Sequence, residues 1–460
     1  MRDVLPGERD KDKPALRGDW TPGGRDTFIF HRARCSGVYL SEEDERALSG
    51  ERGEPVAAAY RVLVAVGEFL GAKRLIPISS AHLSGVNYAN MGEEGLEFLE
   101  RFSASAKVSV HTTVNPCGAD LYDPPSYVPR DFLERQRRIR EAYLRMGCVE
   151  SFTCAPYELE NAPPPGSHVS WAESSAAIFA NSELGLYTNR ESGLSALAAA
   201  VAGKTPEGGM HLEENRVPGY ALRVDPSAVA DYLDYQLAAY YAASRTSSDV
   251  IAFIGPSRPS RPVIKLMSAA IGAAGPSSMF VFSDSAPRDA EVEVLSAEDL
   301  ARLRREMVGS GPIDPSESIG ILGCPFYGRD ELERVAAELA GRRHSPRLFI
   351  QTSRAIESSV GSLADSIRGS GATLLRCACY PLAPVDAWMG AGRIYADSIK
   401  AVHYLRKRGV DAYLRDRAEI LRSFARGPAR RSLDGHGLGQ VPGAIYLRPP
   451  GERQMIREEL

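Results

Sequence analysis

The sequence predicts an α/β fold with several layers and mostly parallel sheets. Short apolar runs rich in Val, Ile and Phe, such as SDVIAFIG at 248–255 and SIGILG at 318–323, have the length and composition of buried strands. Amphipathic helices, such as DFLERQRRIREAYLRM at 131–146, alternate with these runs along the chain. This alternation is typical of parallel sheets covered by helices, because a parallel connection requires a crossover segment.

The alternation begins at about residue 40. Ser41, followed by acidic residues, is typical of a helix N-cap. A largely buried helix is expected at 55–70, a short strand at 74–79 and a longer strand at 107–114. A period of two would place four residues of this last strand on one face: Val108, Val110, Thr112 and Val114.

The second half of the chain repeats the pattern. Further strands are expected at 277–283, 347–352 and 373–379, and helices at 297–307, 329–341 and 396–408. Residues 1–27 are charged, with few apolar side chains to bury, which favours a disordered arm. Residues 28–405 form the main region, with more than one α/β unit, and 406–460 are interpreted as a C-terminal extension.

Composition excludes several classes of partner. The 460 residues include 55 basic and 59 acidic ones, a net charge of −4, so no polybasic field favours nucleic acid or a lipid surface. No apolar run approaches the roughly 18 residues of a membrane span, and the N-terminus lacks the apolar core of a signal peptide. A cytoplasmic protein is expected. Seven cysteines, an odd number, indicate thiols, metal ligands or buried side chains rather than a disulfide framework.

Several chemically capable residues follow predicted strands, where α/β proteins gather their ligands. Asn115, Cys324 and Cys379 lie at such ends, and Cys154 in TCAPY, like Cys324 in GCPF, precedes a proline. No C-x-x-C spacing announces a metal site, so each thiol could equally be a small buried side chain. Cys377 competes with Cys379 for the same role, and Cys117 is a further possibility.

The segment TCAPYELENAPPPGSHVSWAESS, residues 153–175, resembles neither helix nor strand. Glu173 and Ser174 lead into an Ala-rich stretch, so they could cap a helix or act on a substrate. Asn189 and Arg190 in TNRESG concentrate donors and acceptors in what could be a plain turn. Lys400 in DSIKAVHY could be a solvated helix lysine. Neither a G-x-G-x-x-G nor a P-loop pattern is present.

The order of several motifs resembles the large subunit of the aconitase X family over roughly residues 39–405. The motifs are AHLSGVNY, NPCGAD, TCAPYELENAPPPGSHVSWAESSA, ANSELGLYTNRESGLSALAAAVAGKTP, HLEENR, GCPF and CACYPLAP followed by DSIKAVHY. The resemblance implies an aconitase-like multilayer α/β/α fold and hydro-lyase (dehydratase) chemistry on a small hydroxylated carboxylate. The family includes dehydratases of phosphomevalonate and of cis-3-hydroxy-L-proline.

The resemblance also implies a cofactor and a set of site residues. Cys154, Cys324 and Cys379 would hold an iron–sulfur cluster, expected to be 4Fe-4S, with a 2Fe-2S cluster or mononuclear iron as alternatives. The catalytic residues would be Glu173, Ser174 and Lys400. The substrate-binding residues would be Gly85, Val86, Asn87, Asn115, Pro116, Asn189 and Arg190.

Two features qualify this implied function. The family carries its proton-abstracting serine on a small swivelling domain with a GRGSS-like motif, which this sequence lacks, so a separate small subunit is expected. The family pattern also changes at several positions, which favours a substrate other than phosphomevalonate: Asn87, Ala155, Leu186, Tyr187 and Phe326. A non-catalytic ligand-binding homologue and a metal-dependent isomerase are the alternatives.

Overall fold

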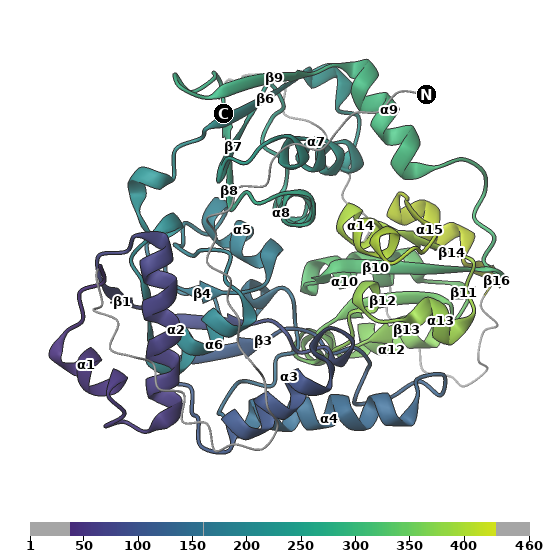
Figure 1. Ribbon diagram of the computed structural model, residues 1–460. Helices are drawn as coiled ribbons and strands as arrows, with labels where there is room; N and C mark the ends of the chain where they lie inside the picture. Colours follow the sequence, from purple (N-terminus) through teal and green to yellow (C-terminus); the bar gives the residue numbers. More distant parts are fainter. Residues whose placement is uncertain (1–36, 160, 429–460) are drawn as a thin grey trace, which may run out of the picture.

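The structure is a computed structural model that describes residues 37–159 and 161–428 (Figure 1). Strands and helices alternate along this part of the chain, and its three larger sheets are built from parallel pairs alone. The predicted α/β fold with mostly parallel sheets is confirmed. The arm expected at 1–27 lies outside the described residues, as does the end of the chain from residue 429.

The first region, residues 37–216, contains a three-stranded parallel sheet in the order β3-β2-β4. The cap predicted at Ser41 is present as a capping box with Asp44 at the start of α1. The region's strands are β1 (Leu75–Pro77), β2 (Ser80–Leu83), β3 (His111–Val114), β4 (Ser170–Trp171) and β5 (Lys204–Pro206). Its helices are α1 (Glu42–Leu48), α2 (Glu54–Leu70), α3 (Tyr88–Ser103), α4 (Arg130–Arg145), α5 (Ser174–Ser182) and α6 (Gly193–Ala202), with short 3-10 turns at Pro156–Glu158, Gly209–His211 and Glu213–Asn215.

The second region, residues 217–317, forms a four-stranded parallel sheet in the order β8-β7-β6-β9, drawn at the top of Figure 1. Helices α7 and α8 pack on each other beneath it. The strands are β6 (Tyr220–Val224), β7 (Val250–Ile254), β8 (Met279–Ser283) and β9 (Glu291–Leu295). The helices are α7 (Tyr232–Arg245), α8 (Arg261–Ala274) and α9 (Ala297–Val308), with a 3-10 turn at Pro226–Ala228.

The third region, residues 318–428, holds a five-stranded parallel sheet in the order β13-β12-β10-β14-β15, at the right of Figure 1. A separate antiparallel pair joins β11 to β16. The strands are β10 (Ser318–Tyr327), β11 (Arg342–His344), β12 (Leu348–Thr352), β13 (Thr373–Leu375), β14 (Arg393–Ala396), β15 (Ala412–Leu414) and β16 (Ala425–Pro428). The helices are α10 (Arg329–Leu339), α11 (Arg354–Val360), α12 (Ser362–Gly369), α13 (Val385–Met389), α14 (Ile399–Lys407) and α15 (Arg417–Ser423), with a 3-10 turn at Tyr380–Leu382.

One apolar core joins the three regions. Trp171 from the first region, Phe253 from the second and Phe349 from the third are all buried in the same cluster. Because burial of large side chains is the main favourable term in folding, this shared core fixes the three regions against one another. Side chains from different regions that contact one another beside this shared core are therefore held in place by the packing of all three regions.

Two predicted strands are shorter than expected. In the strand predicted at 107–114, the backbone N–H groups of Val108 and Ser109 donate to Met146 and to Ala200, so only His111–Val114 pairs with a neighbouring strand. The strand predicted at 373–379 ends at Leu375, which places Cys377 and Cys379 in the loop that follows.

Residues 406–428 belong to the third region as far as the structure describes them. They include β15 on the edge of the five-stranded sheet, and Leu421 and Phe424 are buried in the core of that region. Helix α15 also lies in this segment. Among the described helices, none has both the length and the apolar character needed to cross a membrane.

Candidate active site

The first sheet brings three predicted site segments to one edge. Its central strand β2 pairs in parallel with β3 and with β4, so the carboxyl ends of all three strands point the same way. The chain leaves β2 through Gly85–Asn87, β3 through Asn115–Pro116 and β4 through Glu173–Ser174. The segments implied by the family resemblance are therefore adjacent in space, as ligand-binding loops are in parallel sheets.

Glu173 both caps a helix and faces the third region. Its Oε2 atom accepts hydrogen bonds from the backbone N–H of Ala176 at 2.7 Å and from the Ser175 hydroxyl at 2.6 Å, which is the helix cap at the start of α5. Its Oε1 atom forms a buried ion pair with Lys400 Nζ. Burial alone would raise the pKa of Glu173, but the Lys400 charge and these hydrogen bonds hold it below its usual value. The carboxylate is therefore ionised.

Lys400 reaches this carboxylate from the first turn of α14, after strand β14 of the third region. Besides Glu173, its ammonium donates to the hydroxyls of Ser175 at 3.3 Å and Ser174 at 3.5 Å. Burial disfavours the charged amine, yet Glu173 and the neighbouring thiols outweigh it and raise the pKa of Lys400. Lys400 is thus a buried cation, not the solvated helix lysine that its sequence context also allowed.

The three thiols implied by the resemblance come from three separate segments. Cys154 follows Thr153, whose N–H bonds the Val114 carbonyl at 3.0 Å, so it lies beside the end of β3. Cys324 lies in β10, where the pairing with β12 is interrupted between residues 322 and 327. Cys379 follows β13, and the Cys154 sulfur accepts the Phe326 N–H at 3.2 Å, which joins the first region to the third.

The three thiols lie close enough to influence one another. Burial raises the pKa of Cys154, Cys324 and Cys379 to about 12 each. Charge on Cys324 raises the pKa of Cys154 further, charge on Cys379 raises that of Cys324, and charge on Cys154 raises that of Cys379. Lys400 opposes the shift at all three. All three thiols therefore lie within electrostatic range of the Lys400 ammonium.

This donor set fits a cluster better than a single ion. Across residues 37–159 and 161–428, no three His, Cys, Asp or Glu side chains converge closely enough to bind one metal ion. In an iron–sulfur cluster, by contrast, each thiolate binds a different iron, so the ligands are spaced more widely. One buried and two half-buried thiols within electrostatic range of a cation suit a negatively charged inorganic cluster, whose binding would require that they lose their protons.

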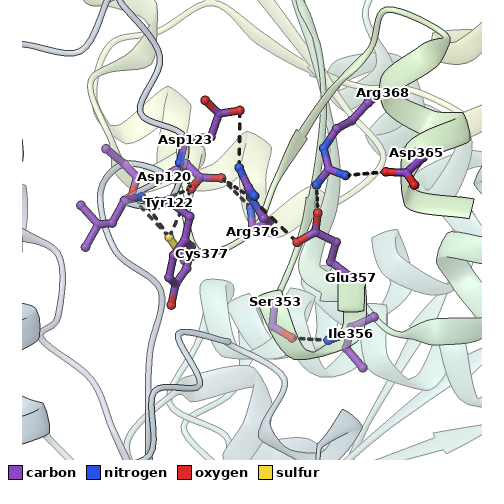
Figure 2. A network of polar contacts seen from close by, with 12 residues as sticks. Asp120, Tyr122, Asp123, Ser353, Ile356, Glu357, Asp365, Arg368, Arg376 and Cys377 are labelled. Carbon is purple, nitrogen blue, oxygen red and sulfur yellow. Dashed lines mark hydrogen bonds and ion pairs between the residues drawn. The ribbon is translucent and has the colours of Figure 1, made fainter. Parts of the chain in front are cut away.

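The Cys377 sulfur contacts the first region near Ala119 and Leu121. The Cys377 sulfur accepts the Leu121 N–H at 3.4 Å and lies 3.6 Å from the Ala119 carbonyl, which it faces with its S–H. Asp120 beside it accepts the backbone N–H of Arg376 at 3.0 Å. Figure 2 shows the Arg376 side chain lying between Asp120 and Glu357. Cys377 thus packs into a polar junction between the first and third regions. It does not compete with Cys379 for the site, although it lies only two residues away.

Asn115 is oriented by a residue that sequence reasoning missed. His82 on β2 is fully buried, and its Nε2 and Nδ1 atoms lie 2.9 Å from Asn115 Oδ1 and 2.8 Å from Thr113 Oγ1. The Thr113 oxygen accepts a hydrogen bond from Asn161 Nδ2 at 2.6 Å, and its own proton faces His82 Nδ1 at 2.8 Å and the Ala81 carbonyl at 3.5 Å, so the shorter contact assigns that proton to His82 Nδ1. The imidazole proton then lies on Nε2 and is donated to Asn115. Asn115 is left to offer its N–H₂ group as a donor.

The β2 loop is held by two polar side chains. Gly85 has a φ of +81°, a conformation that favours glycine. The Val86 carbonyl accepts from Gln136 Nε2 at 2.7 Å, and Asn87 caps α3 by accepting the Ala89 N–H at 2.9 Å. The Nδ2 group of Asn87 is buried and has no hydrogen-bond partner within the described part of the chain. It is therefore a donor left over beside the predicted site.

Asn189 and Arg190 make structural contacts. The Arg190 guanidinium donates to the carbonyls of Gly272 at 2.9 Å, Gly275 at 2.5 Å and Ser277 at 3.2 Å, at the C-terminal end of α8. Asn189 bonds the backbone of residues 208 and 210. These contacts occupy the polar atoms that the resemblance implies for the substrate, and they favour a role in fixing the turn. Substrate binding by this pair remains a prediction.

Two family models match the chain: the aconitase X first domain over residues 37–214 and the aconitase X third domain over residues 318–426. The chain belongs to the aconitase X family. It is 37% identical over 398 residues to a phosphomevalonate dehydratase large subunit of Methanothermobacter thermautotrophicus, an alignment that covers 84% of this chain and 98% of the relative. It is 30% identical over 400 residues to a cis-3-hydroxy-L-proline dehydratase of Pseudomonas aeruginosa, covering 81% and 67%.

A solved structure supports the same assignment. The crystal structure of Thermococcus kodakaraensis aconitase X in its holo-form matches with a TM-score of 0.76 and 34% sequence identity, over 84% of this chain and all of that one. The family and the aconitase X fold expected from the motifs are thus confirmed. Since these relatives of the aconitase X family are named as dehydratases, the protein is a hydro-lyase.

The structure separates the departures from the family pattern that affect the site from those that do not. Tyr187 donates to Glu213, and Arg216 stacks on its ring 4.3 Å from the centroid, a partly exposed arrangement that includes neither the three thiols nor Lys400. Phe326 contributes its backbone N–H to Cys154, a contact open to any side chain except proline. Asn87 is the departure that stands on a loop at the strand ends.

Proposed function

We propose that this aconitase X protein is an iron–sulfur-dependent hydro-lyase that removes water from a small hydroxylated carboxylate together with a separate small swivelling subunit. The observation that carries the proposal is that Cys154, Cys324 and Cys379 lie within electrostatic range of one another and of Lys400, which pairs with the buried Glu173, while the Phe326 N–H joins the Cys324 loop to the Cys154 sulfur. A 4Fe-4S cluster held by three thiolates would leave one iron open to bind the departing hydroxyl as a Lewis acid.

The side chains of the site would bind the substrate as follows. Lys400 provides a buried cation for a substrate carboxylate, and Asn115 offers an N–H₂ group whose direction is fixed by His82. Ser174 places a hydroxyl 3.5 Å from the ammonium. A site built from donors in this way favours an anionic, oxygen-rich substrate over an apolar one.

Glu173 would act as the general acid that protonates the departing hydroxyl group, so that it leaves as water. In the free protein the carboxylate is ionised, and the proton of the pair resides on Lys400 Nζ. A substrate carboxylate beside Lys400 adds negative charge, which raises the pKa of Glu173. Glu173 would then take up a proton from solvent as the substrate binds and donate it to the hydroxyl, which departs as water and leaves the carboxylate ionised again.

The substrate belongs to the same chemical class as those of the relatives. Phosphomevalonate and cis-3-hydroxy-L-proline, named in the relatives, are both hydroxylated carboxylates. Asn87 on the β2 loop, in place of the serine that the family pattern leads one to expect, favours a substrate different from phosphomevalonate. Both compounds are therefore assayed first, together with short hydroxy acids, by formation of the unsaturated product.

Anaerobic purification followed by iron and acid-labile sulfide analysis tests the cluster. The wild type is expected to contain iron and sulfide in equal amounts, and Cys154→Ala, Cys324→Ala and Cys379→Ala to lose both. Cys148→Ala is the matched control, since Cys148 is also buried but lies in the core of the first region. Iron without sulfide would favour the mononuclear alternative, and a wild type free of iron would contradict the proposal.

The partner is tested by co-expression. The relatives that match most of this chain are named as large subunits, which supports a small one here. A tagged form of this chain is expected to retain a co-expressed swivelling-domain protein and to show dehydratase activity only with it. Full activity of the isolated chain would contradict the expected partner.

A further inference from the structure

A fully buried lysine contacts the segments that carry two of the three thiols. Lys265 on α8 is 2% exposed, and its ammonium donates to Glu331 Oε2 at 2.6 Å, to the Phe326 carbonyl at 2.7 Å and to Glu158 Oε1 at 3.3 Å. Burial opposes its charge, but Glu331 and Glu158 outweigh burial and keep its pKa above the ordinary value. One ammonium therefore connects the second region to both other regions.

The partners of Lys265 belong to two of the cysteine segments. Glu158 ends the 3-10 turn that begins just after Cys154, and Phe326 lies two residues after Cys324. The peptide of Phe326 is held on both sides, since its carbonyl accepts from Lys265 and its N–H donates to the Cys154 sulfur. Moving Lys265 would thus displace the contact that joins Cys154 to the Cys324 loop.

A buried glutamine holds the third thiol in the same manner. Gln351 at the end of β12 donates from Nε2 to the Gly323 carbonyl at 3.2 Å and accepts the Tyr380 N–H at 2.8 Å. Gly323 directly precedes Cys324, and Tyr380 directly follows Cys379. The backbones of Gly323 and Gln351 also approach closely, because a Cβ atom on Gly323 would lie 2.5 Å from the backbone carbonyl oxygen of Gln351. The single amide therefore fixes the distance between the two loops.

Stability alone is a weak explanation for these side chains. Removing a lysine and two carboxylates from water is costly, and buried ion pairs can often be replaced by apolar residues without loss of stability. The backbone groups that Lys265 and Gln351 bond all lie within two residues of a thiol-bearing residue. Outer-shell groups of this kind orient metal ligands and tune their affinity.

We propose that Lys265 and Gln351 form a polar frame that sets the spacing of Cys154, Cys324 and Cys379, and that both are positioning residues for the cofactor. The inference rests on the proposed iron–sulfur function. The frame holds the loops before the cofactor arrives, so it lowers the cost of ordering them when the cofactor binds.

The test compares iron retention in Lys265→Met and Gln351→Leu with the wild type. Anaerobically purified proteins are challenged with an iron chelator, and iron loss is followed by absorbance and metal analysis, while thermal unfolding reports global stability. Both variants are expected to lose iron about 10- to 100-fold faster than the wild type, the range typical of outer-shell changes.

Lys204→Met is the matched control, because Lys204 forms a 2.6 Å ion pair with the buried Asp44 in the first region, away from the thiols. It is expected to lower the melting temperature while the rate of iron loss stays at the wild-type value. Equal iron-loss rates in Lys265→Met, Gln351→Leu and wild type would overturn the frame and leave the proposed function intact. A wild type without iron would overturn the proposed function itself.

Glu158→Gln covers the case in which Lys265→Met does not fold. This change keeps the size of the side chain and removes only its charge, so the protein retains its packing. Faster iron loss with an unchanged circular dichroism spectrum is expected. Wild-type iron retention in Glu158→Gln would contradict the role of the ion pair in placing Cys154.

Discussion

Lys400 of the third region and Glu173 of the first form a buried ion pair, although 227 positions separate them in the sequence. Each residue stands at the start of a helix that follows a parallel strand, Glu173 before α5 and Lys400 in α14. The charge on Lys400 influences all three thiols. Several expectations follow from the geometry of the pair and from the neighbouring hydrogen bonds.

Breaking this pair from one side should destabilise the protein strongly. Glu173→Gln leaves the Lys400 ammonium buried without a carboxylate, which costs about 3–5 kcal/mol in the free energy of unfolding. Glu173→Gln combined with Lys400→Met should recover part of this loss, because no charge then remains buried. Denaturant titrations of the single and double variants measure the coupling.

An exposed ion pair provides the control for this cycle. Asp411→Asn removes the partner of Arg393 at 2.8 Å, in a pair whose side chains are about half exposed. Its effect should stay within about 1 kcal/mol. Strict additivity in the Glu173 and Lys400 cycle would show that the two residues do not interact in solution.

Thr113 should determine the hydrogen bonding of His82, the residue that orients Asn115. Thr113→Val removes the proton donor to His82 Nδ1 and the acceptor for Asn161, so Nδ1 loses its hydrogen bond while Nε2–H keeps Asn115 as its acceptor. Each buried group left unpaired costs about 1–3 kcal/mol. Nitrogen NMR of histidine-labelled protein should show Nε2–H for His82 in both proteins, with the Nδ1 signal of the variant shifted from that of the hydrogen-bonded Nδ1 in the wild type.

Thr112→Val is the neighbouring control on the other face of β3. The Thr112 hydroxyl bonds the Val110 carbonyl at 2.8 Å and does not reach His82, so the His82 signal should not change. A wild-type spectrum of Thr113→Val would refute the hydrogen bond from Thr113 to His82.

The neutral state of His82 predicts how stability depends on pH. Burial lowers the pKa of His82 to about 4, whereas the residue titrates near pH 6.5 in an unfolded chain. Between these values the unfolded form binds the proton and the folded form does not, so stability falls as the pH is lowered from about 6.5 to about 4. The total loss from this residue is about 3 kcal/mol.

A His82→Gln variant separates this residue from other titrating groups. His211, with a pKa lowered to about 3 by burial, acts in the same direction. Asp397 opposes both, because burial raises its pKa to about 6 and its folded form takes up a proton first. The free energy of unfolding of His82→Gln should therefore vary less between pH 7 and pH 5 than that of the wild type, and an identical slope would refute the assignment.

Replacing Arg190 should lower the stability of the protein without changing its iron content. Arg190→Met leaves the carbonyls of Gly272, Gly275 and Ser277 without their donor, at a cost of about 2–4 kcal/mol. Iron content should remain at the wild-type level. Arg258→Met is the control, since Arg258 is 52% exposed in its pair with Glu183 and should change stability by less than about 1 kcal/mol.

Loss of substrate affinity in Arg190→Met without loss of stability would favour the substrate-binding role that the family pattern implies. Thermal unfolding and a binding titration on the same preparation decide between the two roles, because a structural role changes the melting temperature first.

Local patterns sufficed for much of the fold. Apolar strands such as Val250–Ile254 and the Ser41 cap could be predicted because burial and hydrogen bonding of near neighbours leave a periodic signal. The strand at 107–114 was predicted too long, since the partners of Val108 and Ser109, at Met146 and Ala200, come from distant parts of the chain.

The sequence by itself determined the alternation of strand and helix, the family, and the motifs that carry Cys154, Cys324 and Cys379. Only the tertiary structure decided how these parts act together. It paired Glu173 with Lys400 and turned the Cys377 sulfur toward Ala119. It also brought His82, Lys265 and Gln351 into hydrogen-bond contact with Asn115, Phe326 and Tyr380. The physical reason is that burial and ion pairing depend on distances in space, which three regions packed on one core set for residues far apart in the chain.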